Sequence, residues 1–487
     1  MNLAIGEIDA TVVVVYLLGV VLFGLWIGRG QRTASGFLLG GRKLPWWGVL
    51  FSIVATETST VTFLSIPGVA FAVGGDLTFL QLTIGYIVGR FIVVWLFLPH
   101  YFRGELFTAY QVLDRRFGGG TKKTASVLFL ITRNLADGLR LFLTAVVLDQ
   151  VIGLDLSVCI VIIGLVTIVY TFCGGMKAVV WNDCIQFIVY MLGAAAAAGV
   201  ILHSLPGGWA QFTQFAAEEG KFRLFDFTID LGLKYTFWSG LIGGVFLALA
   251  THGTDQLMVQ RYLAAGNQKG AGRALMISGF VVCAQFAVFL LIGIGLACFY
   301  QFSPPATAFS RGDQVFARFI VDHLPVGVTG ITVAAVFSAA MSTLSSSLNS
   351  SAAAAVNDLY RPVFSEPPSD RHLLNASRAF TVLFGLVQIA VGIAGQGFQQ
   401  AVIDNVLAIA GFTTGPILGV FFLGVLTKWV SQKSALVGLI HGIGILTAVW
   451  WWQLAAWPWF SVIGAATTFI VGTITESLWI WRKSQQA

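Results

Sequence analysis

Charged residues are scarce in this sequence of 487 residues. Asp, Glu, Lys and Arg together make up 10% of it, and hydrophobic residues make up 57%. An average soluble domain carries about 25% charged residues. So little charge cannot cover the surface of a water-soluble protein of this length, whereas it suits an exterior that faces lipid. The composition predicts an all-α polytopic membrane protein, built as one domain over residues 1–487, that binds no nucleic acid despite its net charge of +6.

Cysteine is also scarce, and no metal-binding motif is present. The five cysteines lie in or beside apolar runs and form no CxxC pair, which argues against a disulfide framework or a zinc site. No HExxH motif occurs, and we interpret the lone His252 and His441 as structural. We therefore expect no cofactor and no enzyme activity, and keep an intramembrane enzyme as a remote alternative. The opening residues MNLAIGEID lack a basic n-region, which predicts an uncleaved first helix.

Long apolar runs recur along the whole chain. A membrane-spanning helix needs about 20 mostly apolar residues, and we count 13 segments that meet this requirement. They lie at 8–28, 46–73, 77–101, 124–150, 156–174, 179–204, 234–255, 272–300, 326–357, 373–396, 401–426, 433–453 and 457–480.

The basic residues divide unevenly between the two sides that this count defines. Twenty of the 28 Lys and Arg residues fall in the loops and tail on one side, and five on the other. Cytoplasmic loops are enriched in Lys and Arg, so we expect the N-terminus outside and the C-terminus in the cytoplasm. We expect the membrane to be a plasma membrane, specifically a bacterial inner membrane. On the outer side, 313–324 has the amphipathic spacing of a helix at the membrane surface.

The second apolar segment is interrupted at its middle by the polar run 55–60, which contains Glu57, and then by Pro67. Such a segment is a poor continuous helix against lipid. It is typical of a broken helix whose free backbone groups line a transport site. The alternative is a Ser/Thr-rich packing face, but packing does not need a carboxylate.

The ninth segment, 326–357, carries small polar residues on one face. Ala339, Ser342, Thr343 and Ser346 recur at helical spacing, and Ser345 lies alongside. Hydroxyl and carbonyl oxygens suit a hard cation such as sodium, although small residues also serve close helix packing. Asp183, near the start of the sixth segment, could complete a cation site or merely cap its helix.

The fourth segment carries three charged residues on one face, Arg133, Asp137 and Arg140. Ionisable residues inside a membrane indicate function. Their charges sum to +1, which Glu57 would neutralise, so one hypothesis is a buried network that includes Glu57. The other is that an arginine left without a counter-charge clamps a substrate carboxylate.

Six stretches together resemble the sodium/solute symporter family over about residues 8–480. They are GGRKLPWW, ATETSTVTFLSIPG, YTFCGGMKAVVWNDCIQ, TDQLMVQRYL, AAMSTLSSSLNSS and GFTTGPILGVFFLGVLTKW. The resemblance implies a leucine-transporter-like fold of two inverted five-helix repeats. The repeats would be 46–204 and 234–426, with an extra N-terminal helix at 8–28 and two C-terminal helices at 433–480.

The resemblance also implies binding residues. A first sodium site would use Ala55, Thr58, Ala339, Ser342 and Thr343, and a second would use Asp183, Ser342, Ser345 and Ser346. The substrate would contact Thr56, Glu57, Ser59, Thr62, Gln81 and Thr83, to which we add Arg140. The sequence departs from the sialic acid branch, because Ala136 stands where that branch has its carboxylate-binding arginine.

The resemblance implies sodium-coupled symport by alternating access, with two sodium ions per cycle. The solute would be a sugar, a polyol or a carboxylated solute such as a sialic acid. The expected partners are that solute, sodium and the lipid bilayer, and the oligomeric state is left open with a monomer as the simplest assumption. The alternative is a proton-coupled or facilitated transporter, because the buried carboxylate of Glu57 could carry a proton.

Overall fold

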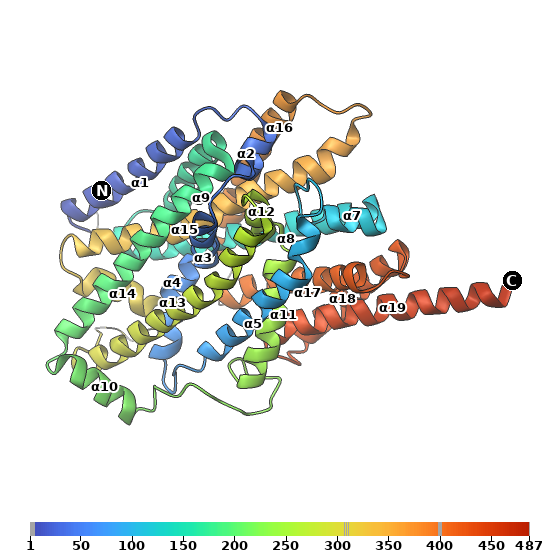
Figure 1. Ribbon diagram of the computed structural model, residues 1–487. Helices are drawn as coiled ribbons and strands as arrows, with labels where there is room; N and C mark the ends of the chain where they lie inside the picture. The colour runs from blue at the N-terminus through green and yellow to red at the C-terminus, as the bar shows by residue number, and fades with distance from the viewer. Residues whose placement is uncertain (1–4, 306, 308, 310, 398–401, 487) are drawn as a thin grey trace.

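The computed structural model describes residues 5–305, 307, 309, 311–397 and 402–486, and this part of the chain is built from helices (Figure 1). Among these described residues, an isolated β-bridge joins Leu44 and Ala265, and no strand is present. The α-helices are α1 Glu7–Ile27, α2 Ala34–Leu39, α3 Trp46–Glu57, α4 Thr60–Phe71, α5 Leu80–Leu96, α6 Leu98–Tyr101, α7 Gln111–Phe117, α8 Gly119–Ile152, α9 Leu156–Ser204, α10 Gly208–Glu218, α11 Gly244–Gly253, α12 Gln256–Ala264, α13 Gln268–Phe302, α14 Asp313–His323, α15 Val328–Ala354, α16 Asp370–Ala394, α17 Val402–Leu426, α18 Gln432–Trp451 and α19 Phe460–Gln486.

Within the described residues, seven helices are long and apolar enough to cross a membrane, or eight if the bent pair α3 and α4 counts as one span. The expected all-helical membrane class is confirmed. Each predicted segment overlaps a helix, although the segment predicted at 401–426 begins at a residue outside the described part. The amphipathic stretch 313–324 forms α14.

The two segments predicted as separate spans, 156–174 and 179–204, form the two helical halves of α9. They meet at Gly175, whose φ of 53° and ψ of −155° are not helical. Glycine is required here because an added Cβ would lie 2.3 Å from the carbonyl oxygen of Phe37. The change of direction between the two halves is therefore made at one residue, without a loop.

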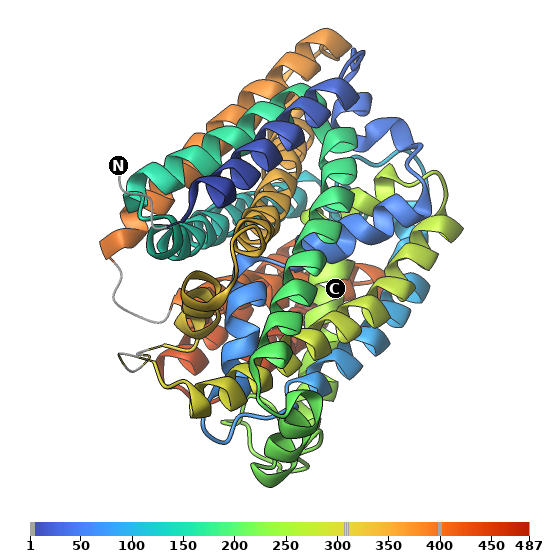
Figure 2. The same ribbon diagram turned by 90° about the vertical axis from the view of Figure 1, so that its left-hand side faces the viewer.

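Helix α15 lies at the centre of the bundle and packs most extensively against α9. Small side chains allow this approach: a Cβ added to Gly193 of α9 would lie 2.7 Å from the Cβ of Ala335. The most apolar stretch of the helical segment Val328–Val363, which contains α15, is 89% buried. The corresponding stretch of α1 is 17% buried. Helices α1 and α16 pack on α9 at one edge of the bundle (Figure 2), whereas α17, α18 and α19 pack on one another. The polar face of α15 thus lies in the protein interior.

Candidate functional site

The site is organised by the break between α3 and α4, whose axes differ by 58°. The last carbonyl groups of a helix lack intrahelical partners. Here the amide of Ser59 donates to the Glu57 carbonyl (3.2 Å) instead of to Ala55 four residues back. The Ser59 hydroxyl then caps α4 by accepting from the amide of Thr62 (3.4 Å). The break predicted from the polar run is confirmed, and Ala55, in the last turn before it, is fully buried.

The five residues predicted for a first sodium site lie on α15 and at the end of α3, two helices that pack against each other at this break. The Thr343 hydroxyl donates to the carbonyl of Thr56 (3.2 Å) and lies 3.4 Å from that of Ala339. The five residues, all buried, are Ala55, Thr58, Ala339, Ser342 and Thr343. Their carbonyl and hydroxyl oxygens are the hard ligands that an alkali cation prefers. Occupancy by sodium stays a prediction.

Two buried residues that the sequence interpretation missed hold Thr58 in place. The side-chain amide of Gln285 lies 2.5 Å from the Thr58 hydroxyl and the Tyr190 hydroxyl lies 3.3 Å from it. The Thr58 hydroxyl itself donates to the Val54 carbonyl (2.9 Å). Gln285 and Tyr190 therefore fix the end of α3, and nothing in the local sequence pattern connects them to it.

Asp183 lies inside α9 and is fully buried, so the interpretation of it as a helix cap is wrong. Its carboxylate accepts hydrogen bonds from Ser52 (2.5 Å) and Ser342 (2.7 Å). Ser346 also converges here, whereas the Ser345 hydroxyl donates to the carbonyl of Ser342 (3.2 Å). Three of the four residues predicted for a second sodium site thus come together.

The guanidinium of Arg261, from α12, lies among these residues. Its Nη2 is 3.4 Å from Asp183 and 2.5 Å from the Thr56 hydroxyl, and it contacts the Ser346 hydroxyl. Arg261 is fully buried, so its charge needs the carboxylate that Asp183 supplies. In this conformation Arg261 provides the positive charge beside Asp183. The motif TDQLMVQRYL contains Arg261, but its partner was not foreseen.

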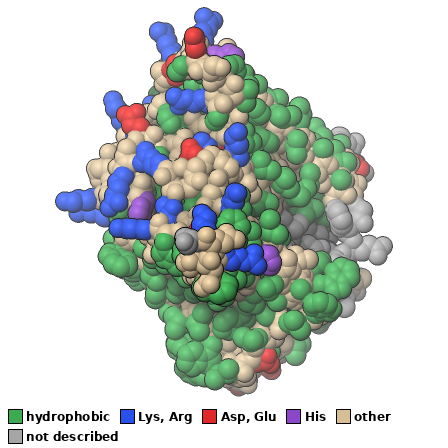
Figure 3. All heavy atoms as spheres, turned by 90° about the vertical axis from the view of Figure 1, so that its right-hand side faces the viewer, with side chains coloured by type: hydrophobic (Ala, Val, Ile, Leu, Met, Phe, Trp, Pro, Cys, Tyr) green, Lys and Arg blue, Asp and Glu red, His purple; other side chains and the backbone are tan. Residues whose placement is uncertain are grey.

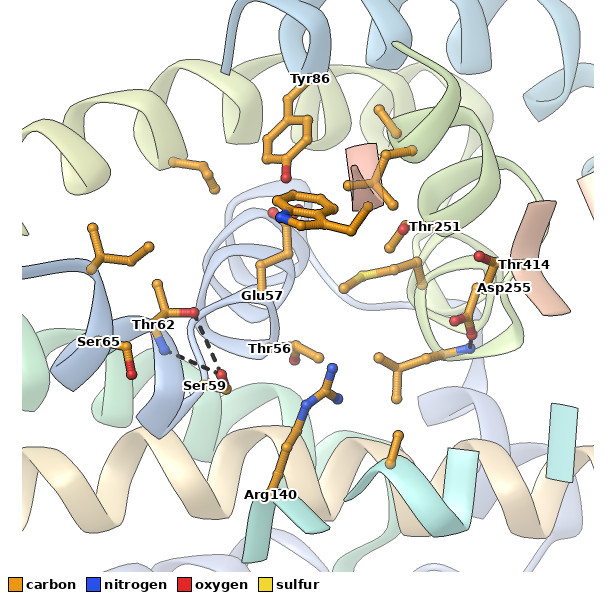
Figure 4. Close-up of a pocket in the computed structure, with 18 of the residues that line it drawn as sticks. Thr56, Glu57, Ser59, Thr62, Ser65, Tyr86, Arg140, Thr251, Asp255 and Thr414 are labelled. Atoms are coloured by element: carbon orange, nitrogen blue, oxygen red, sulfur yellow. Dashed lines mark hydrogen bonds between the residues drawn. The ribbon is translucent and has the colours of Figure 1, made fainter. Parts of the chain in front are cut away.

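A cavity of about 630 Å³ opens beside the break (Figure 4). This volume is in the range of sites for small organic ligands. Five predicted substrate residues line it: Thr56, Glu57, Ser59, Thr62 and Arg140. The residues that line it come from both sides of the break and from α5, α8, α11 and α14, so the cavity lies between helices far apart in sequence.

Two predicted substrate residues do not line this cavity. The side-chain amide of Gln81 donates to the carbonyls of Thr78 (3.0 Å) and Tyr235 (3.1 Å), and its oxygen accepts from the amide of Asp226 (3.0 Å). The Thr83 hydroxyl donates to the carbonyl of Leu80 (2.7 Å). Both side chains serve the local structure of α5 and the loop that covers it.

Glu57 does not join the charges of α8, and the hypothesis of a network that includes them is wrong. Arg90 Nη2 lies 2.5 Å from both oxygens of Glu57, and His252 Nε2 lies 2.8 Å from one of them. Glu57 ends α3 on the side of α5 and α11, which carry Arg90 and His252. His252, interpreted as a structural residue, is therefore part of the cavity wall.

The charges of α8 find other partners. Arg140 Nη1 lies 2.5 Å from Asp137, while Arg133 contacts Asp255 and lies 3.7 Å from Asp137. Asp137 and Asp255 thus balance the two arginines within the protein. Arg140 nevertheless keeps about a fifth of its side chain exposed and lines the cavity.

The polar groups that converge here are hydroxyls, carbonyls and single charged side chains. Among the described residues, no group of three or more His, Cys, Asp or Glu side chains is placed to hold a metal ion. The five cysteines are all free. A site of this composition suits weak binding of a monovalent cation beside a small organic molecule.

The sequence model of the Sodium:solute symporter family matches residues 37–442. The chain belongs to this family. It is 31% identical to the human sodium/iodide cotransporter, covering 91% of this chain and 69% of that protein. It is 29% identical to the sodium/sialic acid symporter SiaT of Proteus mirabilis, covering 97% and 95%. It matches a solved substrate-bound, outward-open Na⁺-coupled sialic acid symporter with a TM-score of 0.88, at 29% identity and covering 97% of this chain and 98% of that chain.

As a member of this family the protein is a multi-pass membrane transporter for a solute. Its relatives are sodium-coupled transporters rather than enzymes. The family resemblance inferred from the six stretches is confirmed, and so is the expectation of transport rather than catalysis.

Proposed function

We propose that this protein carries a small organic solute into the cell together with two sodium ions per cycle, by alternating access. The observation that carries the proposal is the contact between Thr343 of α15 and the carbonyl of Thr56 at the break (3.2 Å), directly beside the cavity. An ion bound between α3 and α15 at this point joins two elements and fixes one wall of the solute site. Sodium binding then favours the conformation that captures solute.

Two ions are favoured by energetics as well as by the cluster around Asp183. Each sodium ion that descends a tenfold gradient yields about 1.4 kcal/mol, and a potential of about 100 mV adds roughly 2.3 kcal/mol per charge. Two ions supply about 7 kcal/mol, enough to concentrate a neutral solute about 10⁵-fold. The second ion would bind at Asp183 when Arg261 withdraws, so that Asp183 always faces one cation.

The finer architecture belongs to the same proposal. We place 13 spans in the membrane, as two inverted repeats at 46–204 and 234–426 with helices at 8–28 and 433–480 outside them. The N-terminus would face outward in a bacterial inner membrane. Lys and Arg side chains gather at the end of the bundle that carries the C-terminus (Figure 3), which supports a cytoplasmic position for this end.

The solute is a sugar, a polyol or a carboxylated solute such as a sialic acid. Ser59 and Thr62 place hydroxyls on one wall of the cavity, and the Arg140 guanidinium points into it (Figure 4). Arg140 favours the carboxylated class, because a guanidinium binds a carboxylate strongly and with defined geometry. Ala136 occupies the position at which the sialic acid branch has its carboxylate-binding arginine. Arg140, one helical turn further along α8, would take over that role.

A proton-coupled or facilitated carrier is the second candidate. The observation that favours it is the hydrogen bond between Glu57 and His252 (2.8 Å) at the cavity wall, because both groups can exchange protons. Under this alternative, uptake follows the pH gradient and needs no sodium.

Uptake into proteoliposomes distinguishes the two candidates. We expect labelled N-acetylneuraminate, gluconate, glucose or sorbitol to accumulate against its gradient only with an inward sodium gradient. Thr343→Ala should lower that accumulation strongly, because it removes one predicted sodium ligand. Uptake that is equal in potassium, or that follows a pH gradient alone, would contradict sodium coupling and favour the second candidate.

A further inference from the structure

Glu57 is a fixed hydrogen-bond acceptor on one wall of the cavity. An ionised carboxylate offers about four acceptor positions. Arg90 Nη2 approaches both oxygens at 2.5 Å and His252 Nε2 approaches Oε1 at 2.8 Å. Three positions are thus taken by the protein, and about one remains, on Oε2. The Glu57 side chain is 16% exposed and lines the cavity, whereas that of Arg90 is fully buried.

The partners of Glu57 leave its carboxylate able to accept a hydrogen bond but not to donate one. The Tyr262 hydroxyl is buried 2.9 Å from His252 Nδ1. A tyrosine hydroxyl that donates to Nδ1 leaves the proton on Nε2, which then donates to Glu57. The guanidinium of Arg90 lies against Gly279, where an added Cβ would be 3.2 Å from the Arg90 Cδ, so the arginine has little room to turn away. Both neighbours therefore keep Glu57 ionised and oriented.

The opposite wall offers the complementary chemistry. The Arg140 guanidinium points into the cavity from α8, toward Thr56 (Figure 4). Asp137 takes Nη1 of Arg140 at 2.5 Å. A guanidinium has five N–H donors, so most of them stay available, within the described residues, for an anionic group of the solute.

The charge of Arg90 determines which kind of donor group of the solute can bind Glu57. Arg90 already balances the charge of Glu57, so an ammonium group at the same carboxylate would be repelled by the Arg90 guanidinium. A hydroxyl group brings a donor without that repulsion.

We propose that the transported solute is a hydroxylated carboxylate, bound with its carboxylate at Arg140 and a hydroxyl group at Glu57. Glu57 is then the residue that determines specificity, with Arg90 and His252 as positioning residues. The inference rests on the proposed sodium-coupled uptake and names the substrate class of the same cavity.

Four six-carbon probes test this inference on the unaltered protein, by thermal shift in sodium and in potassium. Gluconate carries both groups, hexanoate lacks the hydroxyls, sorbitol lacks the carboxylate, and 6-aminohexanoate replaces the hydroxyl with an ammonium. We expect gluconate to bind about 10- to 100-fold more tightly than hexanoate, because an uncompensated charged acceptor is left when the hydroxyl is missing. Sorbitol and 6-aminohexanoate should bind more weakly than gluconate.

The outcomes separate this inference from the proposed function. Equal binding of hexanoate and gluconate, equal binding of sorbitol and gluconate, or tightest binding of 6-aminohexanoate would each overturn it. Binding of none of the four would overturn it as well. Stabilisation by sodium over potassium without any probe tests the proposed function separately, because it does not depend on the solute.

A variant pair locates the effect at Glu57. Glu57→Gln should reduce the preference for gluconate over hexanoate to within a few fold, whereas Thr447→Ala, on the exposed face of α18 and outside the cavity, should leave it unchanged. If Glu57→Gln fails to fold, because Arg90 loses its counter-charge, the double variant Glu57→Gln/Arg90→Gln replaces it. An unchanged preference for gluconate in a folded Glu57 variant would refute the assignment.

Discussion

Substituting both members of the ion pair between Glu57 and Arg90 should lower the stability of the folded protein less than substituting either member alone. The Arg90 side chain is fully buried and that of Glu57 is 16% exposed, with 2.5 Å between charged atoms. Removing one member of a buried pair leaves an uncompensated charge, at a cost of about 3–5 kcal/mol, whereas replacing both members by neutral residues is often close to neutral.

We expect Arg90→Met and Glu57→Gln each to lower stability in this range. Arg90→Met should be the milder of the two, because His252 at 2.8 Å can take a proton and replace part of the lost charge. The double variant should recover most of the loss, giving a coupling energy of at least about 3 kcal/mol.

The assay is a double-mutant cycle on detergent-purified protein, with the midpoint of thermal unfolding measured for all four forms under the same sodium concentration. A matched control is Arg223→Gln, since Arg223 also pairs with an acidic residue, Asp76 (2.7 Å), but is 58% exposed and should lose less than about 1 kcal/mol. Additive effects of Glu57→Gln and Arg90→Met would refute the reasoning that the two charges are buried as a pair.

Three further predictions follow from single contacts. Thr343→Ala should weaken sodium-dependent stabilisation at least several-fold, measured by sodium titration, while Thr447→Ala, on the exposed face of α18, should leave it unchanged. Gly175→Ala should abolish or strongly lower the yield of folded protein, because φ is 53° and the added Cβ would lie 2.3 Å from a carbonyl oxygen; a normal thermal midpoint would contradict this. Lys221→Met should lower stability by about 1–3 kcal/mol, because the Lys221 ammonium donates to the carbonyls of residues 70, 72 and 75 at 2.9–3.1 Å. Limited proteolysis in the loop that follows α4 should therefore become faster, and an unchanged rate would argue against this role.

Local patterns were sufficient to predict the helices and the break. The polar run 55–60 predicted where the second span is interrupted, because hydroxyls and a carboxylate in an apolar helix signal free backbone groups. Helical spacing likewise predicted that Ala339, Ser342, Thr343 and Ser346 share one face, and the structure places this face against the break.

Long-range pairing could not be predicted in the same way. Glu57 lies 33 residues from Arg90 and 195 from His252. Charge counting suggested Arg133 and Arg140 as the partners of Glu57. A sum of charges does not show in which direction each helix carries its charged side chains. Arg261 was missed beside Asp183 for the same reason, since they are 78 residues apart.

The central claim is that sodium binds where α15 passes the break in the second span. The most direct test is the thermal midpoint of the purified protein in sodium chloride and in potassium chloride, for the unaltered chain and for Thr343→Ala, without any solute. The account predicts a midpoint that rises with sodium concentration in the unaltered chain, as expected for a ligand that binds only the folded state, and that rises little in Thr343→Ala. An equal rise in both salts, or an equal sodium response in both proteins, would contradict it.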